Sequence, residues 1–233
     1  MKFTYLCIDL FSVLIPFVFS FHPKVKFSGH FKTFFAANGI VAILFLGWDV
    51  FFTHKGVWGF NPVYVSGIYL AGLPLEELLF FICIPFACVF TYHLIGRYFN
   101  IRWKQQKENI FVISLSVILL VTGLYFHSLA YTSVTFISTA LILLILRFVF
   151  RVSWMGKLFT VYPVLLIPFF LVNGILTGSG LKEPVVWYNN DENLGIRLLT
   201  IPVEDMVYGF ELILLNIFLF EYFKAKTNEA VVA

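Results

Sequence analysis

The sequence predicts an all-α, polytopic membrane protein with seven transmembrane helices. Its mean hydropathy is +0.90, and 60% of its 233 residues are hydrophobic whereas only 12% are charged, unlike soluble domains. Seven apolar stretches are each long enough to cross a hydrocarbon core of about 30 Å as a helix. The expected spans are residues 3–21, 34–52, 73–95, 110–126, 133–150, 158–177 and 203–223.

Basic residues predict how the chain is oriented. Twelve of the sixteen lysines and arginines fall on one side: eleven lie in the connections after the first, third and fifth spans and in the C-terminal tail, and Arg147 lies near the end of the fifth span. Because cytoplasmic loops are enriched in basic residues, we expect a multi-pass protein of the cell inner membrane with its N-terminus outside and its C-terminus in the cytoplasm. The first span has no small-residue cleavage site, so it is expected to be a retained helix. The scattered basic residues do not indicate a nucleic-acid partner.

The two halves of the chain share a motif pattern. Pro74-Leu75-Glu76-Glu77 recurs 128 residues later as Pro202-Val203-Glu204-Asp205. Further matches pair Asp49 and Thr53 with Asn173 and Thr177 at an offset of 124, and Trp58 and Asn61 with Trp187 and Asn190 at 129. The sequence therefore predicts two parallel three-helix repeats, residues 1–97 and 131–233, joined by one extra helix in residues 98–130. Both acidic motifs would then open on the same, outer side of the membrane.

The repeated motif places two adjacent acids at the start of a membrane helix. A carboxylate in the first turn is an ordinary helix start, but two copies at membrane depth, where ionised groups are costly, favour a functional site. Adjacent helical residues are about 100° apart, so one member of each pair should face inward. The row from Glu204 continues with Tyr208 and Glu211, which favours Glu204, and Glu76 by correspondence. The candidate catalytic acids are Glu76, Glu77, Glu204, Asp205 and Asp49.

Carboxyl groups held in a dry pocket favour the neutral form, which can donate a proton, and an ionised neighbour can stabilise positive charge. This combination suits acid-initiated carbocation chemistry. Aromatic residues make up 20% of the chain, and ring faces stabilise cations, although phenylalanine is also an ordinary lipid-facing residue. For Asp9, in the first span, a buried hydrogen bond is as strong an interpretation as catalysis. The candidate substrate-binding residues are Trp58, Asn61, Phe80, Trp187, Asn190, Tyr208 and Glu211.

No cofactor or metal site is expected. The five histidines and three cysteines show neither ligand spacing nor a C-x-x-C pair. Gly178 and Gly180 are not followed by the third glycine of a dinucleotide fingerprint.

The P-L-E-E and P-V-E-D motifs, the preceding Trp58 and Asn61, and the layout of three, one and three spans resemble the membrane-embedded carotenoid lycopene cyclases, in their fused two-repeat form. The likeness covers nearly the whole chain and includes no phytoene synthase domain. The resemblance implies that lycopene or a related linear carotene, held among membrane lipid, has its ψ end closed to a β-ionone ring without net redox change. It also implies other carotenoid enzymes as partners, and leaves open which acid is the proton donor and whether one or both ends are closed.

Two alternatives stay open. A polyprenyl transferase needs aspartate-rich clusters for magnesium diphosphate, and the run from Asn189 to Glu192 has no second copy. A non-enzymatic, proton-coupled transporter built from parallel repeats would use the same acids as proton-binding groups. Such a carrier should have helices broken at the membrane midplane, whereas the acids here cluster at the outer helix starts.

Overall fold

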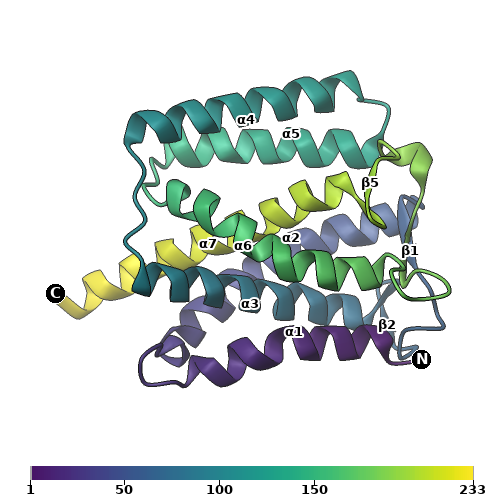
Figure 1. The fold of residues 1–233 in the computed structure, drawn as a ribbon, viewed down its shortest axis with the longest axis horizontal. Coiled ribbons are helices and arrows are strands. Elements are labelled where there is room, and N and C mark those ends of the chain that lie inside the picture. Colours follow the sequence, from purple (N-terminus) through teal and green to yellow (C-terminus); the bar gives the residue numbers. More distant parts are fainter. Residues whose placement is uncertain (1, 233) are drawn as a thin grey trace.

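The computed structural model describes residues 2–232 as a bundle of long helices whose axes run roughly parallel or antiparallel to one another (Figure 1). This confirms the all-α class. The helices are α1 (Thr4–Ser20), α2 (Phe31–His54), α3 (Leu75–Tyr98), α4 (Gln105–Tyr125), α5 (Ala130–Leu144), α6 (Met155–Leu176) and α7 (Val203–Val232). A 3-10 turn, Phe27–His30, precedes α2, and a π-helical turn, Ile145–Val149, continues α5.

Six helical segments of the described chain are long and apolar enough to cross a membrane. They are Phe27–His54, Leu75–Tyr98, Gln105–Tyr125, Ala130–Val149, Met155–Leu176 and Val203–Lys226. The remaining helix, α1, is apolar but has 17 residues. At 1.5 Å per residue it is about 26 Å long, slightly less than the hydrocarbon core. The chain is therefore a multi-pass membrane protein, and the crossing by α1 stays a prediction.

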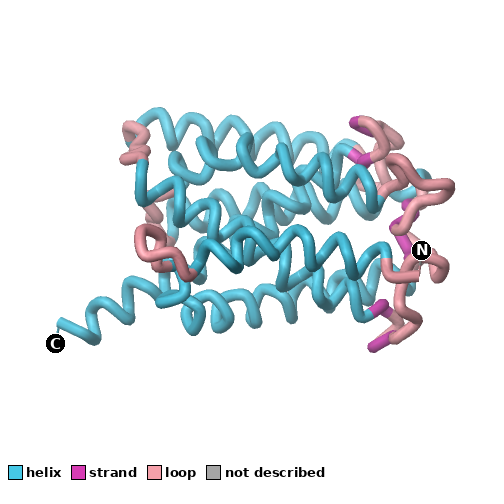
Figure 2. The backbone as a smooth tube through the Cα atoms, turned by 60° about the horizontal axis from the view of Figure 1, so that its bottom comes forward, coloured by secondary structure: helices cyan, strands magenta, loops and turns pink. Residues whose placement is uncertain are grey.

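Short strands and loops gather at the end of the bundle that holds the N-terminus, and the C-terminus lies at the opposite end (Figure 2). The hairpin β2 (Tyr69–Leu70) to β3 (Leu73–Pro74) leads into α3. The hairpin β5 (Arg197–Leu198) to β6 (Ile201–Pro202) leads into α7 in the same way. Both proline-led helices therefore begin at the same end, as the motif pattern predicts.

A third pair of strands joins the two halves. Strand β1 (Trp58–Phe60) runs antiparallel to β4 (Val186–Tyr188). At its ends, the Asn61 N–H donates to the Val185 carbonyl (2.8 Å), and the Asn189 N–H donates to the Val57 carbonyl (2.9 Å). The two donors, Asn61 and Asn189, are 128 residues apart, and so are the two acceptors, Val57 and Val185.

The structure therefore corrects the offset of 129 that matched the tryptophans. Asn61 corresponds to Asn189, because each side-chain oxygen accepts the backbone N–H two residues later, from Val63 and from Asp191. Trp187 corresponds to Gly59, and the two residues face each other across the strand pair. The missing side chain of Gly59 leaves the space that the Trp187 indole occupies.

The helices of the two halves pack across one another. Helix α1 packs on α3, and α5 packs on α7 in the equivalent way, while α3 and α7 contact each other. The second helix of each half crosses over: α2 packs on α7, and α6 packs on α3. Neither half is therefore a separate packing unit.

Two buried asparagines tie this crossing together. Asn38 of α2 donates through its amide nitrogen to the Asn216 side-chain oxygen on α7 (3.1 Å) and to the Phe81 carbonyl on α3 (2.9 Å). Both asparagines are about 2% exposed or less. Amide pairs of this kind stabilise helix association where no water is available to replace them.

Asn38→Ala should lower the stability of the folded protein by about 1–2 kcal/mol, because Asn216 and the Phe81 carbonyl lose a donor. Thermal unfolding of the detergent-solubilised protein measures the effect. Ile40→Ala removes a side chain that is 53% exposed on the same helix and serves as the control. Equal melting temperatures for the two variants would contradict the assigned role.

Candidate active site

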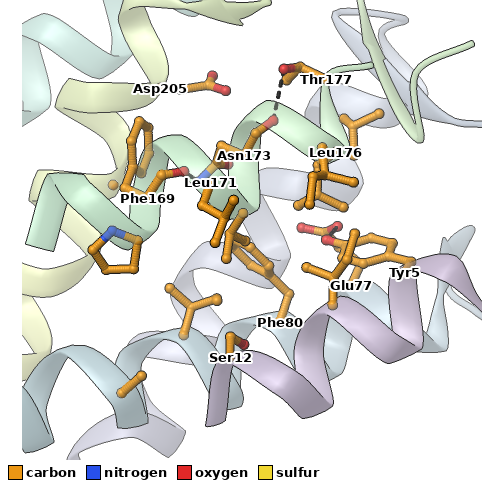
Figure 3. A pocket seen from close by; sticks show the side chains of 18 of the residues that line it. Tyr5, Ser12, Glu77, Phe80, Phe169, Leu171, Asn173, Leu176, Thr177 and Asp205 are labelled. Carbon is orange, nitrogen blue, oxygen red and sulfur yellow. Dashed lines mark hydrogen bonds between the residues drawn. The ribbon is translucent and has the colours of Figure 1, made fainter. Parts of the chain in front are cut away.

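One cavity of about 960 Å³ lies between the two halves near the strand-bearing end of the bundle. Its walls come mainly from α1, α3, α6 and α7, and most of the lining side chains are aliphatic or aromatic. Three carboxyl groups also line it: Asp49 from α2, Glu77 from α3 and Asp205 from α7. Figure 3 shows Tyr5 and Glu77 side by side on one wall and Asp205 projecting from α7 on another.

The cavity opens toward the lipid between α1 and α6. Phe11 and Ile15 of α1 and Leu171 of α6 line it, yet each is more than 60% exposed. Along α3 the lining runs from Glu77 to Thr91, a rise of about 21 Å at 1.5 Å per residue. The space is thus an elongated, apolar groove whose acidic end lies close to the loops at the strand-bearing end of the bundle (Figure 2).

Glu77 and Asp49 form a carboxyl pair at this acidic end. The Tyr5 hydroxyl donates to Glu77 Oε2 (2.5 Å), and the Trp58 indole N–H donates to Asp49 Oδ1 (2.5 Å). The two carboxyl groups also lie within hydrogen-bonding reach of each other. A hydrogen bond between two carboxyl groups requires a proton on one of them, so the pair can hold a transferable proton beside an apolar cavity.

Asp205 is held differently. Its Oδ1 accepts from the Tyr131 hydroxyl of α5 (2.6 Å) and its Oδ2 accepts from the Tyr188 hydroxyl of β4 (2.9 Å). Burial raises the pKa of Tyr188 above its ordinary value, and the Asp205 carboxyl raises it further. Tyr188 therefore remains a neutral donor, and two such donors stabilise an anionic Asp205. Asn173, the counterpart of Asp49, also lines the cavity, but its amide has no acidic proton to transfer.

The other two motif acids anchor loops instead of lining the cavity. Glu204 Oε1 accepts from the Leu194 N–H (2.8 Å) and the Thr132 hydroxyl (2.6 Å). Glu76 Oε1 accepts from the Ser66 N–H (2.6 Å), the same contact 128 residues earlier. The prediction that Glu204 faces inward, which relied on the row through Tyr208 and Glu211, is therefore wrong. Asp205 faces the cavity instead. Glu211, which extended that row, instead accepts from Ser138 and Thr139 on α5.

The structure separates the candidate substrate-binding residues into two groups. Trp58, Phe80 and Tyr208 line the cavity. The other four do not belong to its lining. In the loops at the strand-bearing end, Asn61 donates to Glu183 and Asn190 accepts from Arg197. Trp187 is 44% exposed in the same region, and the fourth residue is Glu211.

Tyr5, Tyr131 and Tyr188 were not predicted as site residues from the sequence. Tyr5 and Tyr131 lie at the starts of α1 and α5 and make the same contact in each half, to Glu77 and to Asp205. A repeat alignment of the first and fifth spans could have found this pair. Tyr188 has no such signal, because its role depends on the β1–β4 pairing. Among residues 2–226, whose side chains the structure describes, no three His, Cys, Asp or Glu side chains are grouped to hold a metal ion.

Comparison with protein families gives a match to a known family. The family model described as Lycopene cyclase matches residues 2–95 and 127–223, one segment in each half of the chain. No match was found among curated proteins, and none was found among solved structures.

Proposed function

Because this chain belongs to the lycopene cyclase family, we propose that it is a lycopene β-cyclase, which closes the ψ end group of lycopene or a related linear carotene to a β-ionone ring. The observation that carries the proposal is the single apolar groove faced by two unlike acidic groups, the proton-sharing pair Glu77–Asp49 and the tyrosine-held Asp205. A proton donor and a separate proton acceptor are what this redox-neutral reaction needs.

The first step assigned to the site is proton transfer from the Glu77–Asp49 pair to C2 of the end group. This leaves a cation at C1. The C5–C6 double bond attacks C1, the ring closes, and the positive charge moves to C5. Trp58, Phe80 and Tyr208 lie on the cavity wall, where their ring faces can stabilise the cation.

The last step is loss of the proton from C6 to Asp205. An anionic carboxyl held by Tyr131 and Tyr188 is suited to accept it and to stabilise the preceding cation. One proton enters and one leaves, and no electrons are transferred. The apolar lining excludes water, which would otherwise capture the cation as an alcohol.

Family membership leaves the transferase and carrier alternatives without support. The groove also fits a long hydrophobic polyene better than a diphosphate. Among the described residues that line it, Lys2, which precedes α1, is the one lysine or arginine.

Expression in bacteria that accumulate lycopene should convert the red pigment to a cyclic carotene. Purified enzyme in D₂O should add one deuterium per ring, because the proton delivered to C2 comes from an exchangeable acid. Chromatography and mass spectrometry measure both outcomes. Unchanged lycopene, with the protein verified in the membrane, would remove the proposed activity.

Glu77→Gln and Asp205→Asn should each lower kcat by about 100-fold or more, since loss of a general acid or base has effects of that order. Glu204→Gln should keep activity within about threefold, because the amide oxygen can still accept from the Leu194 N–H and the Thr132 hydroxyl. Pigment assays at matched protein levels compare the variants. If Asp205→Asn keeps wild-type activity and Glu204→Gln is inactive, Glu204 and not Asp205 is the proton acceptor.

We also propose that α1 is a seventh span and that the acidic end of the groove faces outward in the cell inner membrane. The twelve basic residues at the opposite end support this orientation. A cysteine introduced at Asn190 should react with an impermeant thiol reagent added to intact cells, whereas one at Lys26 should react only after lysis. The reverse labelling pattern would invert the orientation.

A further inference from the structure

Asp9 is a buried acid that the proposed reaction does not use. It lies on α1, its side chain is 0% exposed, and neither carboxyl oxygen has a hydrogen-bond partner in the described protein. It is not among the residues that line the cavity. The expected buried hydrogen bond is therefore missing. An acid kept in an apolar helix without a donor is costly, so it must carry a proton or contact water.

Asp9 lies where α1 packs on the start of α3, beside the acidic motif. It is one turn after Tyr5 on the same face of α1, and α1 packs directly on α3. It lies close enough to Glu76 and Glu77 for their charges to interact. Glu76 is 1% exposed, and its Oε2 also lacks a partner, while its Oε1 accepts from the Ser66 N–H of the outer loop. Three buried carboxyl groups, those of Glu76, Asp9 and Glu77, thus lie near one another where α1 packs on the start of α3.

The proposed reaction creates a need for a proton path. After each ring closure the donor pair has lost a proton and Asp205 has gained one, so the donor must be recharged before the next turnover. The Trp58 indole donates to Asp49 of the pair. An indole N–H is a donor only and cannot pass a proton onward. The Tyr208 hydroxyl, which lies near Asp49, Glu77 and Asp205, is the competing return route.

We propose that Asp9 is a proton-relay residue that recharges the Glu77–Asp49 pair from the outer loop through Glu76. The Asp9 carboxyl gives its proton to the deprotonated pair and regains one from water at the Ser66 loop by way of Glu76. Asp205 releases the C6 proton to the outer loops past Tyr188. One proton enters and one leaves in each cycle, with no change of redox state. The inference rests on the proposed cyclase activity and adds the path by which its donor is restored.

The test is rapid-quench kinetics of Asp9→Asn in detergent, with lycopene as substrate. Asparagine has the shape of aspartate but carries no transferable carboxyl proton. The first turnover should stay within about threefold of wild type, because the pair is charged before mixing. Steady-state turnover should fall by about tenfold or more and show a larger solvent deuterium isotope effect.

Two further variants separate a relay from a structural role. Asp9→Glu keeps the carboxyl group and should restore most of the steady-state rate. Leu10→Ala alters the neighbouring residue, 53% exposed, and should leave both phases unchanged. If the first turnover of Asp9→Asn is slowed as much as its steady state, the relay is overturned. Wild-type kinetics in Asp9→Asn would also overturn it and would favour proton return through Tyr208. An inactive wild type would overturn the cyclase activity and the relay with it.

Discussion

Every carboxyl group on the groove wall is held by a donor from another part of the chain, and the rest of the site depends on these contacts. Glu77 is held by a tyrosine of α1, Asp49 by the indole of β1, and Asp205 by tyrosines of α5 and β4. In a bilayer, water cannot replace a lost partner, so each acid keeps its position and protonation only while its donor is in place. The donors therefore fix where α1 and α5 start and how the loops pair.

The repeat supplies a common frame, and a few substitutions make the two halves unlike. Both halves have a tyrosine on the second motif acid and a loop N–H on the first. Asp49 of the first half is replaced by Asn173 in the second, so only one half holds a carboxyl pair. A symmetric frame thereby presents two acidic groups of different character to one substrate.

The helix crossings make this shared site possible. Because α2 packs on α7 and α6 packs on α3, each half contributes to the core of the other. The buried asparagine pair holds the α2–α7 crossing in register. Helix α1 packs mainly on α3 and has few contacts with α6. The groove therefore opens laterally between α1 and α6. A substrate dissolved in lipid can then reach the acids without passing through water.

The sequence by itself determined the helical class, the membrane segments and the pairing of the acidic motifs, because hydropathy and local motifs are properties of neighbouring residues. The span expected at residues 73–95, for example, is the helix Leu75–Tyr98. It could not decide which motif acid faces the groove. Side-chain rows define the faces of a helix, but the packing of α5 and of the loop before α7 decides that Glu204 faces Thr132 and Leu194. Asp205 is then the acid that faces the groove. The tryptophan match was misleading for a related reason: residue type is local, whereas the β1–β4 register is set by hydrogen bonds between segments more than a hundred residues apart.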